Sequence, residues 1–322
     1  MMQQYLDVKA KHQDCIVFFR LGDFYEMFFE DAQLVSRELE LTLTGKDCGL
    51  SERAPMCGIP YHAAAAYLSR LIEKGYKVAI CEQVTDPALS KGLVEREVVR
   101  IVTPGTVVDP AMLDEKSSSY LLCVAFAGKE AALAYTDVST GEFIVHQAKD
   151  AAAALRDEIT RISPNEIVTG DEALLTEYLG ETVAVTRLPA SAFERKHAQV
   201  LLLSHFSVAS LAALGFETGD KRVIAAGALL RYLNDTQKNS LSHITQITFF
   251  QSGDTMFLDR ATRRNLELTE SLRSGDYAHA SELYGQALKG LYATDPDLML
   301  GLAKAQFGLG ESAKARATLD AL

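Results

Sequence analysis

Short apolar runs alternate with amphipathic stretches along the first hundred residues. Three apolar runs predict buried strands, at 16–19, 76–81 and 98–102. Two stretches with apolar residues at helical spacing predict helices, at 23–39 and 63–74. Asp23 is expected to cap the first helix and Gly75 to end the second, while Gly58-Ile59-Pro60 predicts a turn. This order of elements indicates an α/β domain with a mixed sheet over residues 1–104.

Residues 105–116 have the composition of a linker, with the chain-breaking pairs Pro104-Gly105 and Asp109-Pro110. Three predicted strands follow, at 120–126, 131–135 and 142–146. After them come one further predicted strand, at 166–168, and four predicted helices, at 150–162, 171–178, 198–204 and 221–234. Three strands that lead into alternating helices and strands indicate a ribonuclease-H-like layer architecture over 117–253.

From residue 254 the pattern is helical, and the last fifty residues contain an internal repeat. Gly275-Asp276-Tyr277-Ala278 resembles Gly310-Glu311-Ser312-Ala313 at a spacing of 35. Tetratricopeptide units repeat about every 34 residues. We therefore expect an all-α, tetratricopeptide-like tail over 275–322, with too few units to form a stable solenoid alone.

The formal net charge of the 322 residues is −11, and the parts 1–104, 105–253 and 254–322 are each net acidic. Coating DNA through its phosphates needs clustered Lys and Arg, so any DNA binding is expected to be local and shape-driven. Five cysteines are scattered without a Cys-x-x-Cys spacing, which predicts buried free thiols and no metal site. No apolar run could span a bilayer and no signal peptide is recognisable, so a cytoplasmic protein without membrane contact is expected.

The segment 22–28 permits a purely structural interpretation. A set of apolar residues follows the helical spacing of one core-facing stripe: Phe24, Phe28, Ala32, Val35 and Leu39. Asp23 and Glu26 fit the D-x-x-E pattern of a helix capping box. Taken alone, these patterns favour Phe24 as a core residue and Glu26 as a cap.

The same segment, Gly22-Asp23-Phe24-Tyr25-Glu26-Met27-Phe28, resembles the mismatch-recognition motif of the MutS family, an aromatic residue and a glutamate separated by one residue. The resemblance extends to about residue 274 through five further motifs, at 55–62, 78–83, 99–106, 136–141 and 258–267. It implies a mismatch-recognition domain at 1–104, a ribonuclease-H-like connector domain at 117–253 and the start of a helical core domain at 254–274.

The resemblance implies that the chain recognises mispaired or looped duplex DNA in mismatch repair. Phe24 would wedge against the mispaired base and Glu26 would hydrogen-bond to it, with Tyr25 placing the two on different sides of the helix start. A mismatch has a weakened stack and kinks easily, so an apolar wedge and one polar probe suit its recognition. A carboxyl group can accept a hydrogen bond or, when protonated, donate one, which suits several wrong bases. By the same resemblance a MutL-like repair protein would bind the connector domain.

Other residues are weaker candidates. Lys91 and Arg100 could contact the DNA backbone, although single surface cations usually have no specific role. Asp137 follows a strand of the connector segment, where a nuclease could hold metal. A nuclease would need further carboxylates converging on it, and support of the turn is the favoured role of Asp137.

A phosphate-binding loop needs a Gly-Lys pair with Ser or Thr directly after it and a second glycine five positions before the first. The Gly-Lys pairs at 45–46 and 128–129 have neither, so no phosphate-binding loop is found. We therefore expect no ATP binding and no enzyme activity. ATP and Mg²⁺ are expected only for a full-length family member, and no other cofactor or metal is expected. Without the family's dimer surfaces the chain is expected to be monomeric. A second class of function stays open, a protein-interaction module whose connector and tail bind repair partners while DNA contact is vestigial.

Overall fold

The computed structural model describes residues 1–48, 53–84, 94–109, 112, 118–179, 183–238, 241–250, 281, 284–285, 288, 296–308 and 311–321. Contacts divide the chain into two compact units. One holds two β-sheets, and the other holds the helices α10 (Pro296–Gly308) and α11 (Ser312–Asp320). Within the described part of the chain, every helix is too short or too polar to span a bilayer.

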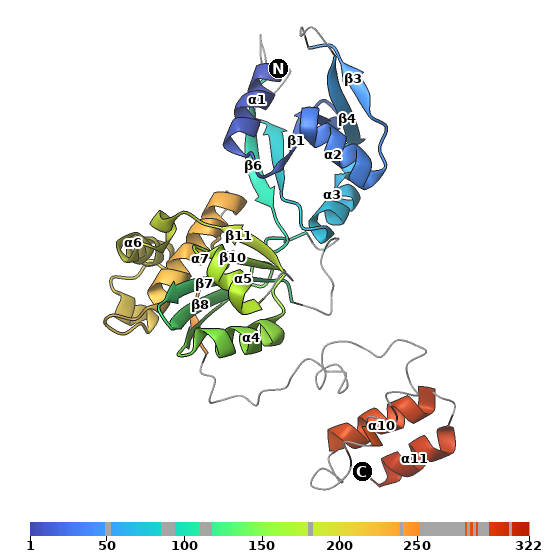
Figure 1. Cartoon of the computed structure of the whole chain (residues 1–322), viewed down its shortest axis with the longest axis vertical. Coiled ribbons are helices and arrows are strands. Elements are labelled where there is room, and N and C mark those ends of the chain that lie inside the picture. The colour runs from blue at the N-terminus through green and yellow to red at the C-terminus, as the bar shows by residue number, and fades with distance from the viewer. Residues whose placement is uncertain are drawn as a thin grey trace. The chain divides into compact units, whose positions relative to one another are not determined.

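The first sheet has six strands in the order β3-β4-β2-β1-β5-β6 (Figure 1). The strands are β1 (Ile16–Leu21), β2 (Phe24–Phe28), β3 (Thr44–Lys46), β4 (Ala54–Pro60), β5 (Val78–Gln83) and β6 (Arg96–Val102). β1 and β5 run parallel, and the other neighbouring strands run antiparallel. The three predicted strands are confirmed as β1, β5 and β6, whereas β2, β3 and β4 were not predicted.

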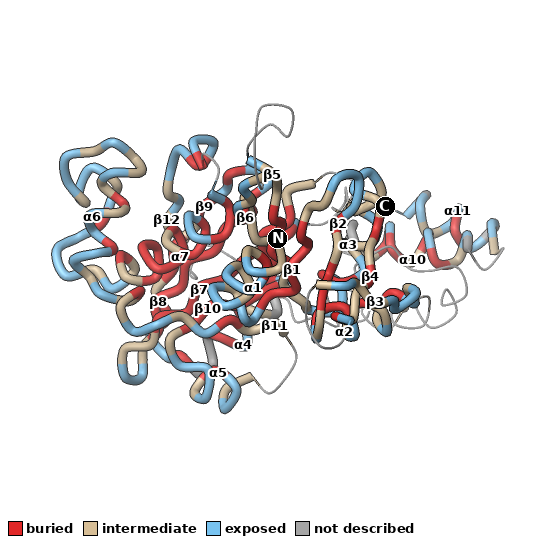
Figure 2. The backbone as a smooth tube through the Cα atoms, turned by 90° about the horizontal axis from the view of Figure 1, so that it is seen from above, coloured by how far each residue is buried: buried red, intermediate tan, exposed pale blue. Residues whose placement is uncertain are grey.

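Three helices cover this sheet: α1 (Met2–Lys11), α2 (Phe29–Leu39) and α3 (Ala64–Glu73), the last preceded by a 3-10 turn at Tyr61–Ala63. Side chains alternate between the two faces along each strand, so the sheet has two separate cores. Phe18 and Tyr25 pack with α2 and α3 on one face. Phe19 and Phe28 pack with Tyr5 of α1 on the other. The central strands β1 and β5 are accordingly buried over most of their length (Figure 2).

The helix α1, which the pattern did not predict, is fixed by the buried Asp31 in the first turn of α2. One carboxylate oxygen of Asp31 accepts hydrogen bonds from the Tyr5 hydroxyl and the Val17 amide, both at 3.0 Å. The other accepts from the Lys9 ammonium at 2.8 Å. Burial, reinforced by the Asp31 charge, raises the pKa of Tyr5, so its hydroxyl stays protonated and donates. A carboxylate also suits the positive end of the α2 dipole.

The prediction of a helix beginning at Asp23 is wrong over its first turn and a half. Gly22, with a φ of 58°, and Asp23 instead connect β1 and β2 as a two-residue hairpin in which Leu21 pairs with Phe24. α2 begins only at Phe29, and its N-cap, Phe28, makes no side-chain capping bond. Pairing with β1 on one side and β4 on the other satisfies the β2 backbone, and this tertiary gain outweighs the local helical pattern.

The predicted turn at Gly58-Ile59-Pro60 is also wrong, because these residues form the end of β4. Gly58 pairs with Glu26 and Pro60 with Phe24. Proline is tolerated at this position because β3 pairs only with residues 54–56 of β4, so that among the described strands β4 has a neighbour on one side only at Pro60. The predicted helix 63–74 is confirmed as α3, and Gly75 follows it with a φ of 84°.

The second sheet has the order β11-β10-β7-β8-β9-β12. Its strands are β7 (Tyr120–Ala127), β8 (Glu130–Asp137), β9 (Glu142–Ala148), β10 (Glu166–Thr169), β11 (Ala184–Arg187) and β12 (Thr248–Phe249). Its helices are α4 (Ala151–Ile162), α5 (Glu172–Leu179), α6 (Arg195–His205) and α7 (Arg222–Gln237), with 3-10 turns at Ala190–Phe193 and Leu211–Leu214. The predicted meander, the strand at 166–168 and the four helices are confirmed, and the mixed α/β class holds for both sheets.

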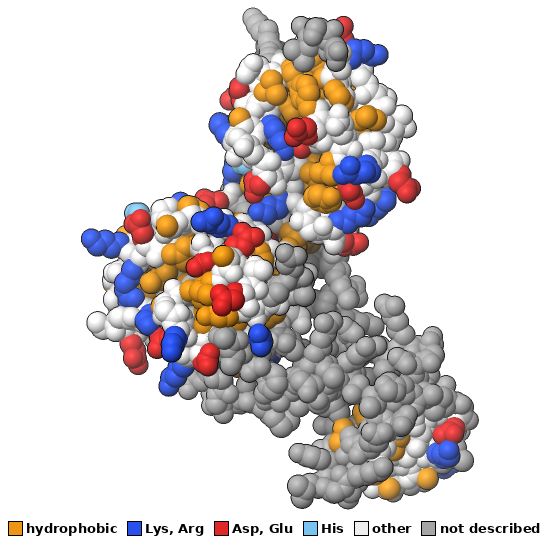
Figure 3. Space-filling view, viewed as in Figure 1, with side chains coloured by type: hydrophobic (Ala, Val, Ile, Leu, Met, Phe, Trp, Pro, Cys, Tyr) orange, Lys and Arg blue, Asp and Glu red, His pale blue; other side chains and the backbone are white. Residues whose placement is uncertain are grey.

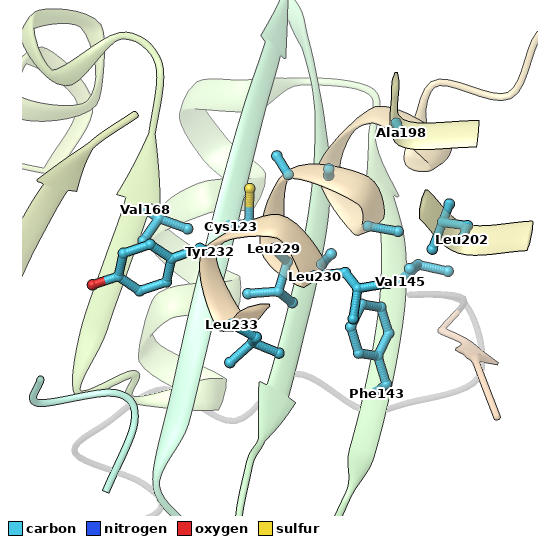
Figure 4. Close-up of a cluster of buried hydrophobic side chains, with 14 of the residues drawn as sticks. Cys123, Phe143, Val145, Val168, Ala198, Leu202, Leu229, Leu230, Tyr232 and Leu233 are labelled. Atoms are coloured by element: carbon cyan, nitrogen blue, oxygen red, sulfur yellow. The ribbon is translucent and has the colours of Figure 1, made fainter. Parts of the chain in front are cut away.

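Helix α7 forms the centre of the second core (Figure 4). Leu229, Leu230 and Leu233 are fully buried among residues of β7, β9 and α6. Gly227 allows α6 to approach α7, because a Cβ at this position would overlap the Cβ of Ala198. All-round burial explains why α7 carries little amphipathic pattern although it is the longest helix described.

The expected linker at 105–116 begins as packed chain. Residues 103–107 are buried, and Val107 and Val108 pack against the cores of the first and second sheets respectively. The fully buried Glu166 carboxylate anchors this segment. It accepts hydrogen bonds from the Thr103 hydroxyl, the Gly105 amide and the hydroxyls of Thr186 and Tyr232. The chain between the two sheets is therefore fixed at its start by a satisfied polar network.

In the tail, α10 and α11 pack against each other (Figure 1). Tyr284 and Ala305 are buried together, and a Cβ at Gly301 would lie 2.5 Å from the Tyr284 ring. Phe307 is 70% exposed on α10. The expected core-domain segment 254–274 lies outside the described residues.

Candidate nucleic-acid interface

The strand β2 brings Phe24 and Glu26 to the same face of the first sheet. Phe24 is 47% exposed and Glu26 is half-buried, while Tyr25 between them is buried in the opposite face. The expectation that Phe24 and Glu26 lie on different sides of a helix start is therefore wrong, because alternate residues of a strand share a face. The capping-box interpretation is wrong because α2 begins only at Phe29. The core interpretation is wrong for Phe24 alone, because the other four residues of the stripe are buried, namely Phe28, Ala32, Val35 and Leu39.

Gly58 of β4 forms the floor between these two side chains. It pairs with Glu26, and a Cβ at Gly58 would lie 3.6 Å from Cγ of Glu26 and 3.9 Å from Cδ1 of Phe24. The glycine thus leaves the space between the aromatic ring and the carboxylate open. Sequence reasoning missed this residue because it assigned Gly58 to a turn.

Lys46 of the edge strand β3 was also missed, and it forms an ion pair with Glu26. The Lys46 ammonium lies 2.5 Å from Oε2 of Glu26 and 5.7 Å from the centre of the Phe28 ring. The Lys46 side chain is 31% exposed and that of Glu26 16% exposed. Twenty positions separate the two residues, and they meet only through the pairing of β3, β4 and β2.

An arginine–aromatic stack lies beside the β1–β2 hairpin. The Arg20 guanidinium carbon lies 3.7 Å from the centre of the Tyr61 ring, which is 44% exposed. The Tyr61 amide donates to the Asp23 carbonyl at 2.9 Å, and this bond fixes Tyr61 next to the hairpin. On the opposite face of β2, the Tyr25 hydroxyl donates a hydrogen bond to Glu82 and anchors the strand. Burial and this hydrogen bond raise the pKa of Tyr25.

Of the two weaker backbone candidates, the structure describes only Arg100, which does not join this surface. Arg100 is half-buried on β6 and pairs with Ile80, whose side chain packs in the core beside Phe18 and Tyr25. The Arg100 side chain therefore belongs to the face opposite Phe24 and Glu26. Lys91 lies outside the described residues.

Asp137 supports the turn after β8. One oxygen of its carboxylate accepts hydrogen bonds from the Ser139 amide at 2.9 Å and the Ser139 hydroxyl at 2.6 Å. The other accepts from the Ser119 amide at 3.1 Å. Among the described residues, no three His, Cys, Asp or Glu side chains could share a metal ion. The contacts of Asp137 are thus those of a turn-supporting residue.

Charge is mixed over the surface in view. On the face shown in Figure 3, Lys and Arg side chains are interspersed with Asp and Glu over both sheet-bearing parts. This distribution agrees with the net charge of −11.

The sequence matches known proteins over both sheet-bearing parts of the chain. Residues 1–111 match the family model for MutS domain I, 119–245 that for MutS domain II and 271–322 that for a tetratricopeptide repeat. The chain is 50% identical over 281 residues to the DNA mismatch repair protein MutS of Acetivibrio thermocellus and to that of Ruminiclostridium cellulolyticum, covering 85% of this chain. It is 47% identical over 283 residues to the protein of the same name from Symbiobacterium thermophilum. The chain spans about a third of the length of these relatives, 32% in each case. The chain therefore belongs to the MutS family, whose domains I and II it carries ahead of a tetratricopeptide segment.

Proposed function

We propose that this chain recognises mispaired or looped duplex DNA in mismatch repair, with Phe24 as the wedge and Glu26 as the polar probe. The observation that carries the proposal is the exposed Phe24 ring beside the Glu26 carboxylate on one strand face, above a floor opened by Gly58. A phenylalanine with this much exposure contributes little to the core. Its exposure suits contact with a ligand.

The energetics of stacking explain how such a wedge discriminates. Contact between a base and an aromatic ring contributes roughly 1–3 kcal/mol, and unstacking one base step costs a few kcal/mol. The cost is lower where the stack is already weakened by a mispair. Insertion of Phe24 is therefore favourable mainly at mismatched or looped sites.

Glu26 would supply one hydrogen-bonding contact to the unstacked base. Its second oxygen, Oε1, has no hydrogen-bond partner among the described residues. A carboxylate oxygen can accept a hydrogen bond from an amino or imino group of several bases. This generality suits a site that must recognise different mispairs.

We infer further that the second sheet is a ribonuclease-H-like connector. The order β9-β8-β7-β10-β11, with β8 antiparallel to its neighbours and β10 and β11 parallel to β7, supports this assignment. A MutL-like repair protein is its proposed partner, and the chain is proposed to be monomeric. The alternative is an interaction module with vestigial DNA contact. It is not favoured, because the relatives are named as DNA mismatch repair proteins.

Titration of the full chain with matched and single-mismatch duplexes at low ionic strength tests the proposal. The wild type is expected to bind the mismatched duplex more tightly, and Phe24→Ala is expected to remove that preference. Val200→Ala is the matched control, because Val200 is 68% exposed on α6, in the second sheet's domain. Equal affinity of the wild type for both duplexes would overturn the proposal.

A further inference from the structure

The carboxylate proposed to contact the mispaired base is already held by one of its two oxygens. Oε2 of Glu26 accepts from the Lys46 ammonium at 2.5 Å. Among the described residues, Lys46 is the one partner of this carboxylate. A carboxylate fixed through one oxygen has a defined plane and presents the other oxygen in a defined direction.

The position of Lys46 makes this contact a specific one. Lys46 pairs with Ala54 on β4, whereas Glu26 pairs with Gly58, so the lysine side chain must extend along the sheet to reach the carboxylate. Its ammonium lies 5.7 Å from the centre of the buried Phe28 ring. At this distance the face of the ring attracts the ammonium, which favours a position of Lys46 beside Glu26.

Lys46 also offsets the negative charge of Glu26. An uncompensated carboxylate next to a duplex is repelled by the phosphates. The Lys46 ammonium offsets the negative charge at the point where DNA would approach most closely. The neutral pair can then be brought against a base edge at a lower electrostatic cost.

We propose that Lys46 is a positioning residue that determines mismatch specificity: it holds Oε2 of Glu26, directs Oε1 toward the unstacked base and offsets the charge of the carboxylate. This inference rests on the proposed function of Glu26. In this role Lys46 acts through Glu26. A Lys46 that contacted a phosphate directly would instead strengthen binding to matched and mismatched duplexes equally.

A double-mutant cycle on the full chain tests the role of Lys46. Lys46→Met keeps the length of the side chain and removes the charge, while Lys46→Arg keeps the charge. Each is titrated with matched and single-mismatch duplexes in the wild-type and Glu26→Gln backgrounds. We expect Lys46→Met to lower the ratio of mismatched to matched affinity by about fivefold or more, the scale of one well-placed base contact. We expect Lys46→Arg to retain most of the ratio, and Lys46→Met to leave the ratio unchanged in the Glu26→Gln background.

Three outcomes would overturn the inference. If Lys46→Met weakens binding to both duplexes equally and lowers the salt dependence by about one unit of slope, Lys46 contacts a phosphate. If the affinity ratio falls equally in both backgrounds, Lys46 acts independently of Glu26. If the wild type itself shows no preference for the mismatched duplex, the proposed function fails and this inference fails with it. Thermal melts of each variant distinguish these outcomes from loss of the fold.

Discussion

The side chains of Phe24 and Glu26 share one face of β2, while Tyr25 between them is buried in the opposite face. The alternation separates two tasks within three residues. The outer pair is available to a ligand, and the inner tyrosine anchors the strand to the core and to Glu82. Substitutions within this short segment should therefore have opposite effects on binding and on stability.

We expect Phe24→Ala to change the free energy of unfolding by about 1 kcal/mol or less, because half of the ring is already in solvent. Tyr25→Ala should cost about 3–5 kcal/mol, as is typical when a large buried aromatic is removed. Urea denaturation of both variants measures the two values. A loss of several kcal/mol for Phe24→Ala would show that the ring belongs to the core after all.

Removal of the Glu166 carboxylate should destabilise the packing of the chain between the two sheets. Glu166→Ala leaves four buried donors without their acceptor, which should cost at least about 3 kcal/mol. Tyr232→Phe removes one donor only and should cost about 1 kcal/mol. Denaturation of the two variants side by side checks the difference. Equal costs would mean that the carboxylate is not the centre of the network.

Stability should fall in acid partly through Asp220. Burial alone would raise the pKa of Asp220, but the hydrogen bonds and charge of Arg222 outweigh it and lower the pKa below its ordinary value near 3.8. A carboxyl whose pKa is lower in the folded state stabilises the fold above its ordinary pKa. That stabilisation is lost as the pH falls through the lowered value. The denaturation midpoint of Asp220→Asn should therefore depend less on pH between about 5 and 2 than that of the wild type. Parallel curves for the two proteins would contradict this.

Four of the five cysteines should resist alkylation in the folded chain. Burial raises the pKa of Cys15 and Cys81 to about 12 and that of Cys57 to about 11, and it also raises the pKa of Cys123. Thiols that stay protonated and buried react slowly with alkylating agents. Cys48 is only half-buried, so the reagent can reach its thiol more easily. Iodoacetamide at pH 8 followed by mass spectrometry should show labelling at Cys48 first. Rapid native labelling of Cys123 would contradict the buried core.

The chain should be monomeric at moderate concentration, and any association should involve the tail. Phe307 is 70% exposed on α10 and Leu319 is 48% exposed on α11, which leaves apolar surface in the helix pair. Light scattering over a concentration series measures the mass. A dimer that does not dissociate on dilution would refute this expectation, and deletion of 275–322 would show whether the tail holds it together.

The sequence by itself determined most of the elements and the family of the chain. Apolar runs located β1, β5 and β6, and the three strands of the meander were located in the same way. The turns of the meander lie at Gly128 and Gly141, both of which have positive φ. The motif in 22–28 pointed to Phe24 and Glu26. These features depend on neighbouring residues, and local patterns report them.

Only the tertiary structure decided the conformation and the partners of that motif. Phe24 and Phe28 are four positions apart, a spacing that places them on one side of a helix and equally on one face of a strand. The strand forms because β1, across the two-residue hairpin, and β4, from a distant part of the chain, supply its backbone partners. The Lys46–Glu26 pair and the Glu166 network likewise join residues 20 to 66 positions apart. Local periodicity carries no information on such contacts, because they depend on which strands pair and in which register.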